Sequence, residues 1–175
     1  NDLESTSYCP VLAPLWDDLH TGRTVDGTYP FAGSVQYLQQ GTAPNRTFTI
    51  QYQYAYWYYN ASPASWVNFQ VVLKENGGVS IKYGPNAGTS PGTSASASIG
   101  INMLPGGATN FWSVTPGSPA TASNTVENAT INAYIPNGTV YNFNPPVGVP
   151  NDLSAMAITG STTPSVGTST AYTIT

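Results

Sequence analysis

The chain is 175 residues long and only 7% of its residues are charged, whereas charged residues make up about 25% of a typical soluble domain. Its four basic and eight acidic residues leave a net charge of −4, which excludes the basic surface that nucleic acids and anionic membranes attract. The longest uncharged run, residues 83–126, is rich in Gly, Ser, Thr and Pro, so it cannot form a transmembrane helix.

Composition also limits which disulfides and metal sites the chain can form and indicates where the protein is located. Aromatic residues make up 12% of the chain, and 17 Gly and 15 Pro residues provide many turns, a mixture typical of short β-strands. The single Cys9 permits no internal disulfide, and the single His20 leaves no second imidazole for a metal site. Low charge with abundant Thr, Ser and Asn indicates an exposed extracellular protein. Because the sequence begins at Asn1 rather than at Met, we expect a piece of a longer protein.

Residues 47–59 form the first long predicted strand, because apolar and polar side chains alternate there with a period of two. The odd positions are mainly Thr, Gln and Ala. The even positions should share the other face, and they are Phe48, Ile50, Tyr52, Tyr54, Tyr56 and Tyr58. The run therefore predicts one aromatic face and one mainly polar face.

Two further strands are predicted to follow as a hairpin. A turn at residues 60–63 precedes an alternating run at 67–74, and residues 79–83 form the return strand. Between these strands, Asn76-Gly77-Gly78 supplies the left-handed backbone that a tight hairpin needs. We therefore predict an antiparallel meander of three strands.

Shorter strands and loops complete the first part of the chain. Residues 84–94 and 115–123 are predicted loops, whereas residues 95–101, 111–114 and 138–143 are predicted strands. A strand is also expected to end near Trp16. The total of about seven to nine strands predicts an all-β fold, an antiparallel two-sheet sandwich of jelly-roll or immunoglobulin-like type. We assign this β-sandwich module to residues 1–146.

A Pro-rich segment separates the last part of the chain. Residues 147–153 follow two prolines and contain a third, which predicts a stiff, extended linker. Beyond it, residues 155–159 and 170–175 have the composition of two strands. Residues 154–175 are therefore predicted to be a C-terminal β-hairpin from a following domain, and a hairpin this small needs a partner surface.

Five motifs, in this order and spacing, resemble a β-sandwich module of large secreted surface proteins of Bacteroidota, which are often exported by the type IX secretion system. The motifs are LAPLWDDL at residues 12–19, GTAPNRTF at 41–48, NFQVVL at 68–73, ASIGI at 97–101 and GTVYNFNPP at 138–146. The Pro-Leu-Trp-Asp-Asp and Phe-Gln-Val-Val-Leu segments are also similar to the extracellular nidogen-type domain. Residues 151–175 resemble the start of an immunoglobulin-like adhesion repeat.

The resemblance implies a module that is stacked with others in an array on the cell surface. The chain departs from the family pattern in two ways. The family module has several strands ahead of the Trp-Asp-Asp motif, whereas this chain starts close to that motif, and no type IX sorting signal follows at the end. We therefore expect an internal segment that lacks N-terminal strands, and unpaired strand edges favour pairing with other chains, as in a filament.

Asp17, Asp18 and Arg46 form the first candidate site. Neighbouring carboxylates on a loop can chelate calcium, which takes about six to eight oxygen ligands. The alternative is a structural clasp, in which one Asp caps backbone amides and the other pairs with Arg46 across the sheet. The motif thus predicts either a clasp at the seam of the sandwich or a metal site at Asp17 and Asp18, with calcium as the one cofactor considered.

Aromatic side chains form the second candidate site. Trp57, Tyr59 and Trp66 flank the turn between the first two strands of the meander. Exposed rings there would stack on sugar rings or bury area at a protein interface. The alternative is that the tyrosines at even positions form core and cross-strand pairs. If their rings are exposed, Trp57, Tyr59 and Trp66 are the predicted ligand contacts.

The sequence does not favour an enzyme. His20 has no nucleophile-elbow motif beside it, and no spacing selects two carboxylates for glycosidase chemistry. Cys9 is predicted to be a small buried hydrophobe rather than a reactive thiol.

We predict a non-catalytic structural or adhesive module of a secreted bacterial cell-surface protein. A carbohydrate-binding module and a calcium-stabilised interaction domain are the alternatives. The expected partners are other chains or repeats of the same surface protein, with glycans in the carbohydrate-binding alternative. Neither nucleic-acid binding nor membrane insertion is expected.

Overall fold

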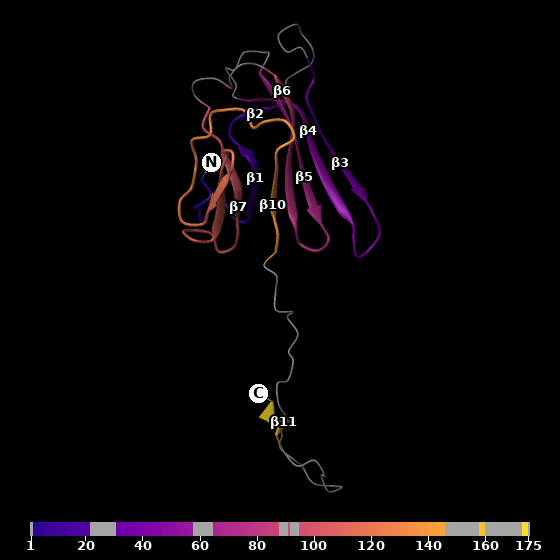
Figure 1. Ribbon diagram of the computed structural model, residues 1–175, viewed down its shortest axis with the longest axis vertical. Coiled ribbons are helices and arrows are strands. Elements are labelled where there is room, and N and C mark those ends of the chain that lie inside the picture. Colours follow the sequence, from indigo (N-terminus) through magenta and orange to yellow (C-terminus); the bar gives the residue numbers. More distant parts are fainter. Residues whose placement is uncertain are drawn as a thin grey trace. The chain divides into compact units, whose positions relative to one another are not determined.

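The computed structural model describes residues 2–21, 31–57, 65–87, 91, 95–145, 158–159 and 173–174. The chain divides into two units, Asn1–Asn144 and Pro145–Thr175. Within the described residues all regular elements are β-strands, and those of the first unit lie in two antiparallel sheets (Figure 1). The prediction of an all-β, antiparallel two-sheet sandwich is confirmed.

The smaller, four-stranded sheet has the strand order β1-β7-β8-β9. Its members are β1 (Val11–Trp16), β7 (Ser98–Asn102), β8 (Phe111–Thr115) and β9 (Thr121–Ser123). Strand β9 lies inside the segment that the sequence predicts as a loop, because three residues suffice to pair with β8 between Pro- and Gly-rich flanks.

The larger, six-stranded sheet runs in the order β10-β6-β5-β4, with β2 and β3 both paired to β4. Its members are β2 (Leu19–His20), β3 (Ser34–Gln40), β4 (Thr47–Trp57), β5 (Trp66–Lys74), β6 (Val79–Ala87) and β10 (Val140–Phe143). The predicted meander is confirmed as β4, β5 and β6. Strand β3 was not predicted, because Leu38 directly follows Tyr37 and interrupts the alternation.

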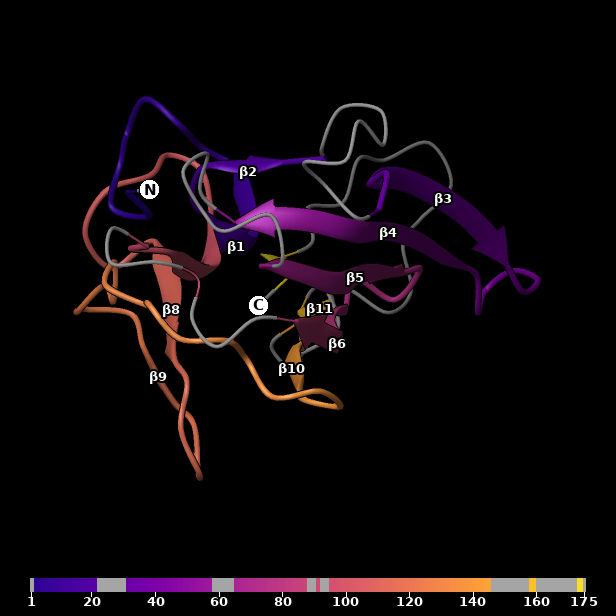
Figure 2. The same ribbon diagram turned by 90° about the horizontal axis from the view of Figure 1, so that it is seen from above.

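Alternating side chains of both sheets form the main core. Odd positions of β5 and β6 point inward, since Val67, Phe69, Ile81 and Tyr83 are all buried. On the other side of this core, the four-stranded sheet contributes Leu15, Ile99 and Val114. The buried residues of β5 and β6 lie on the part of the six-stranded sheet that the four-stranded sheet covers. By contrast, β3 lies well away from β8 and β9 of the four-stranded sheet (Figure 2).

A β-bulge in β4 reverses the alternation of this strand. The register with β5 shifts between Tyr52 and Ala55, and Tyr54 has a positive φ of 51°. Asn68 holds the bulge, since its Oδ1 accepts the Tyr54 N–H at 2.7 Å and its Nδ2 donates to the Pro85 carbonyl at 3.0 Å. The prediction that the even-numbered tyrosines share one face is therefore wrong beyond Tyr52.

The N-terminal segment packs on the four-stranded sheet around a buried amide. Asn102 Nδ2 donates to the carbonyls of Leu3 and Tyr8, and its Oδ1 accepts the Val11 N–H at 2.6 Å. Leu3 itself is fully buried, in a small second core with Ala13 and Phe111. The segment before β1 is thus an integral part of this sandwich.

In the described part of the second unit there are two short strands. β11 (Ile158–Thr159) and β12 (Thr173–Ile174) pair antiparallel, with Ile158 opposite Ile174. They fall within the two predicted strands of residues 154–175. The predicted linker at residues 147–153 lies outside the described residues.

Candidate functional site

Asp17 lies at the junction between the two sheets. It follows the last residue of β1 in the four-stranded sheet and precedes β2 in the six-stranded sheet. Its Oδ2 accepts the Trp57 indole N–H at 2.9 Å and the Ser96 backbone N–H at 2.7 Å, while its Oδ1 accepts the Asp18 N–H at 2.9 Å. Because Trp57 ends β4 and Ser96 precedes β7, one carboxylate joins segments of both sheets.

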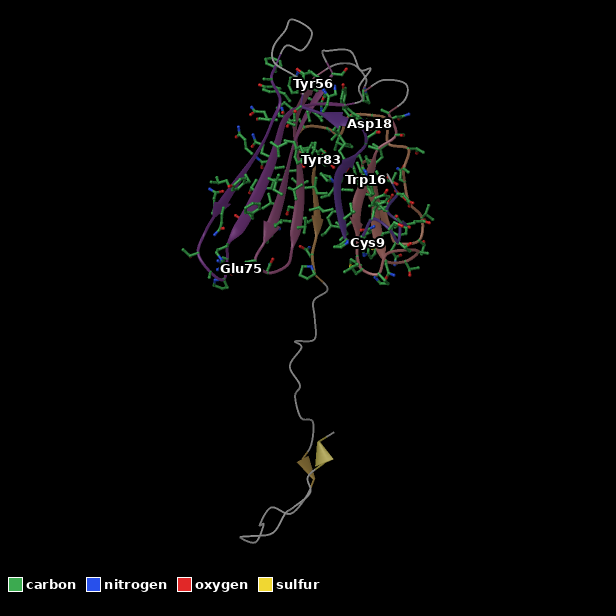
Figure 3. All side chains as sticks on the ribbon, turned by 180° about the vertical axis from the view of Figure 1, so that it is seen from behind. Cys9, Trp16, Asp18, Tyr56, Glu75 and Tyr83 are labelled. Carbon is green, nitrogen blue, oxygen red and sulfur yellow. The ribbon has the colours of Figure 1, made fainter. Side chains whose placement is uncertain are left out.

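The prediction that Asp17 or Asp18 pairs with Arg46 was wrong. Arg46 pairs with Glu75, with Nη2 and Oε1 2.5 Å apart and Nε 3.0 Å from both carboxylate oxygens. Figure 3 shows Glu75 and Asp18 at opposite ends of the sandwich, which places Arg46 far from the Trp-Asp-Asp motif. Asp17 still acts as a clasp, but its partners are an indole and backbone amides.

The Arg46–Glu75 pair closes the ends of two neighbouring hairpins. The Arg46 backbone N–H also donates to Glu75 Oε2 at 2.9 Å, and the Glu75 N–H donates to the Arg46 carbonyl at 2.9 Å. The Arg46 side chain lowers the pKa of Glu75, and the Glu75 carboxylate raises the pKa of Arg46. Since both groups are exposed to solvent, this pair orders a turn rather than forming a binding site.

The Trp-Asp-Asp motif offers few free oxygen ligands for calcium. Asp18 is exposed, and both oxygens of Asp17 already accept N–H groups. Across the described ranges, no group of three or more His, Cys, Asp or Glu side chains is close enough to hold a metal ion.

The three predicted ligand contacts, Trp57, Tyr59 and Trp66, have different outcomes in the structure. Trp57 is fully buried in the main core, so its assignment as an exposed contact was wrong. The bulge at Tyr54 explains the error, because it turns the end of β4 so that Ala55 and Trp57 face inward. Tyr59 lies outside the described residues. Trp66 is half-buried, on the face of the six-stranded sheet that points away from the core.

Trp66 belongs to an aromatic cluster that the sequence did not predict. Its ring meets Tyr54 and Phe31 edge-on, with centroids 5.0 and 5.9 Å apart, and Phe31 stacks on Tyr54 at 4.4 Å. The buried Tyr56 fixes Phe31, because its hydroxyl accepts the Phe31 N–H at 3.1 Å and donates to the Phe31 carbonyl at 2.8 Å. Phe31 remains 41% exposed, so the cluster reaches the surface. Only the bulge brings these residues to one face.

The lone histidine lies beside this cluster. His20 pairs with Tyr56 across β2 and β4, and the two rings stack with centroids 5.4 Å apart. Partial burial lowers the pKa of His20 below its ordinary value. The neutral imidazole is therefore the form that this packing favours.

A second link between the sheets lies deeper in the core. The Tyr83 hydroxyl, on β6, donates to the Pro14 carbonyl of β1. Burial raises the pKa of Tyr83 well above its ordinary value, and the neighbouring Tyr141 adds to this shift. Tyr83 therefore remains a neutral donor and ties the six-stranded sheet to the four-stranded sheet (Figure 3).

Cys9 lies in the N-terminal segment and is only half-buried, which differs from the predicted buried hydrophobe. Its Sγ lies 3.4 Å from the carbonyl oxygens of both Thr6 and Pro105. These contacts are the ones a protonated thiol makes as a weak donor, and they hold the segment before β1 against the loop after β7.

Side chains on the core-facing side of the six-stranded sheet extend beyond the other sheet as an exposed apolar strip. We define the apolar strip as Val35, Tyr37, Phe48, Ile50 and Leu73. Val35 and Tyr37 lie opposite Tyr52 and Ile50 in register, so they share the inward face of β4. Tyr37 stacks on Phe48 with centroids 5.4 Å apart, yet its side chain is 75% exposed. The strip has the composition of a protein core, yet Val35, Tyr37 and Leu73 are exposed to solvent.

The opposite side of the same sheet carries mainly amide and hydroxyl groups. Gln70 Nε2 donates to Gln51 Oε1 at 2.7 Å, and Ser80 Oγ donates to Asn142 Oδ1 at 2.6 Å. A shallow groove on this side is lined by residues that include Gln36, Leu38, Thr49, Gln51, Gln70 and Lys82. It therefore offers hydrogen-bonding groups and one cation, but no carboxylate.

Comparison with known proteins assigns the family. The family model described as NIDO related matches residues 1–145, which covers the β-sandwich unit and most of the chain. No curated protein and no solved structure matches significantly. The structure has no helix in its described part that is long and apolar enough to cross a membrane. A NIDO-related domain points to an extracellular protein, in agreement with the nidogen-type resemblance of the Trp-Asp-Asp motif. The chain belongs to the NIDO-related family.

Proposed function

We propose that this chain is a non-catalytic structural or adhesive module of a secreted, cell-surface protein that contacts other chains or repeats of that protein. The apolar strip on β3, β4 and β5 is the observation that carries the proposal. Apolar patches that remain open on a folded domain mark contact sites for other macromolecules. A NIDO-related domain supports the extracellular setting of such a contact.

The finer setting that we propose is a multi-domain array or filament on a bacterial surface. The five motifs that resemble modules of Bacteroidota surface proteins support this setting, as does the short strand pair β11 and β12 after the sandwich. The full sequence of the parent protein tests it. Further repeats and a type IX sorting domain in that sequence would support the array, and a single isolated domain would contradict it.

Adhesion of coated beads tests the function itself. Beads coated with this chain should adhere to a surface coated with the extracellular part of the parent protein. The Tyr37→Lys variant should lose adhesion, because it places a charge on the apolar strip. The control Leu104→Lys alters a side chain that is also exposed but belongs to the loop after β7, and it should adhere normally. Wild-type beads that adhere no better than beads coated with albumin would overturn the proposal.

Carbohydrate binding is the second candidate function, and the aromatic cluster of Phe31, Tyr54 and Trp66 favours it. The cluster reaches the surface on the same side of the sheet as the amide-lined groove. Aromatic faces stack on the apolar faces of sugar rings, and amide groups match sugar hydroxyls as donors and acceptors.

A glycan array tests this candidate. Saturable binding to a glycan should be lost in Trp66→Ala and retained in Trp112→Ala, because Trp112 is an exposed tryptophan of the other sheet. An array without binding would remove the carbohydrate-binding candidate and leave the adhesive proposal in place.

A further inference from the structure

We infer that β3 is a self-association edge, through which two copies of this chain pair their six-stranded sheets. This inference deepens the adhesive function proposed above by naming one partner, and it rests on that proposal.

Strand β3 is an unprotected sheet edge. All its pairing is with β4, so its other side has no strand against it within the described residues. Six of its seven residues are exposed, and the sequence SVQYLQQ contains no charge and no Pro. Natural proteins protect sheet edges with charges, Pro, bulges or very short strands. β3 has none of these features, and its register with β4 is continuous from Ser34 to Gln40.

An antiparallel pair of β3 strands centred on Tyr37 has two-fold symmetry. In this register Val35 lies opposite Gln39 of the second copy, Gln36 lies opposite Leu38, and the two Tyr37 side chains face each other. Side chains of one face stay on that face, because all these pairs join two odd or two even positions. The apolar strips of the two copies then meet at the Tyr37 pair and become one continuous surface. Aromatic cross-strand pairs stabilise sheets in this way.

Charge favours a second copy as the occupant of this edge. Neither β3 nor the residues of β4 that pair with it, Thr47 to Gln53, carry a charged side chain. Near the edge, Arg46 and Glu75 neutralise each other. A two-fold pair through β3 therefore sets uncharged strands against each other, although each chain carries a net charge of −4. Two-fold pairing also closes, which limits the assembly to a dimer.

Sedimentation velocity of the full chain over a range of concentrations tests the inference. We expect a reversible monomer–dimer equilibrium that stops at the dimer. Val35→Lys and Tyr37→Lys should each weaken dimerisation by at least about tenfold, because each places a charge among the cross-strand pairs of the joined sheets, and Tyr37→Lys sets two lysines directly opposite each other. Val140→Lys is the matched control: Val140 is 45% exposed on β10, at the opposite edge of the same sheet, and Val35 is 51% exposed on β3. This control should dimerise like the wild type.

Three results would overturn the inference. One is a wild-type chain that stays monomeric at its highest soluble concentration. Another is a dimer that is weakened equally by Val140→Lys. The third is a series of species that keeps growing with concentration, which would indicate head-to-tail pairing instead. Thermal melts of the variants should match the wild type, which ensures that a lost dimer is not a lost fold. If the chain is monomeric but coated beads still adhere to the parent protein, the adhesive function stands and the β3 contact fails.

Discussion

The Asp17 carboxylate accepts a hydrogen bond from the Trp57 indole at 2.9 Å, and through this contact the end of β1 is joined to the end of β4. The two strands belong to different sheets. The most charged motif of the sequence thus serves the packing of the sandwich. The surface that we propose for contacts lies elsewhere, on the uncharged strand β3.

Removal of the Asp17 carboxylate should destabilise the fold. Asp17→Ala should lower the free energy of unfolding by about 1.5–3 kcal/mol, because hydrogen bonds to a charged group are lost and a buried indole loses its acceptor. The exposed neighbour Asp18 provides the control, and Asp18→Ala should have little effect. Denaturant unfolding measures both. In a Trp57→Phe background, Asp17→Ala should lower the free energy of unfolding by clearly less than in the wild type. An equal loss in both backgrounds would show that the contact with the indole is not the source of the stabilisation.

The Tyr83 hydroxyl should contribute to stability through its bond to Pro14. Tyr83→Phe keeps the ring in the core but leaves the Pro14 carbonyl without this donor, which should cost about 1–3 kcal/mol of unfolding free energy. Tyr37→Phe removes a hydroxyl from an exposed ring and should be nearly neutral. Equal effects of the two substitutions in chemical denaturation would contradict the role of Tyr83 as a link between the sheets.

Gly100 should not tolerate a side chain. A Cβ at this position would lie 2.1 Å from the Trp112 carbonyl oxygen and 2.7 Å from Leu3 Cδ1. Gly100→Ala should therefore destabilise the protein by about 1–3 kcal/mol or more. Gly84 is the matched control, since its nearest neighbour would be Asn68 Cβ at 3.4 Å, an ordinary contact. Gly84→Ala should be neutral or stabilising by up to about 1 kcal/mol, and a similar loss at both sites would argue against close packing at Gly100.

His20 should make stability depend on pH in the weakly acidic range. Burial lowers its pKa in the folded state below the ordinary value of 6.5, so below that pH the unfolded chain binds more protons than the folded chain. The contribution to stability is therefore complete above pH 6.5 and is lost as the pH falls through the folded-state pKa. An NMR titration of this single imidazole should give a midpoint below 6.5. A midpoint at or above that value would contradict the burial seen beside Tyr56.

Alternation in the sequence was sufficient to predict the fold class and the central strands. Val67, Phe69, Ile81 and Tyr83 face the core as their spacing predicts. The candidate site could not be predicted in the same way, because one bulge at Tyr54 moves Trp57 from a predicted surface position into the core. No local pattern marks that bulge, since its anchor Asn68 comes from the next strand.

Long-range pairing explains the other errors. Arg46 meets Glu75 rather than Asp17 because β4 and β5 are paired antiparallel, so the start of β4 lies beside the end of β5. The sequence places Arg46 and the Trp-Asp-Asp motif in one family pattern but contains no information on which ends of the sheet they occupy. Strand β3 was missed because Tyr37 and Leu38 break the alternation, and its exposed edge is visible only from its place in the sheet.

Hydrogen exchange of the β3 amides at several protein concentrations tests whether two copies pair through β3. Those amides of β3 that point away from β4 have no strand partner among the described residues of one chain, so they should exchange quickly in dilute solution. If two copies pair through β3, protection at residues 34–40 should rise with concentration while protection in β10, at the other edge, stays constant. Protection of β3 that does not change with concentration, in a chain that remains monomeric, would contradict pairing through β3.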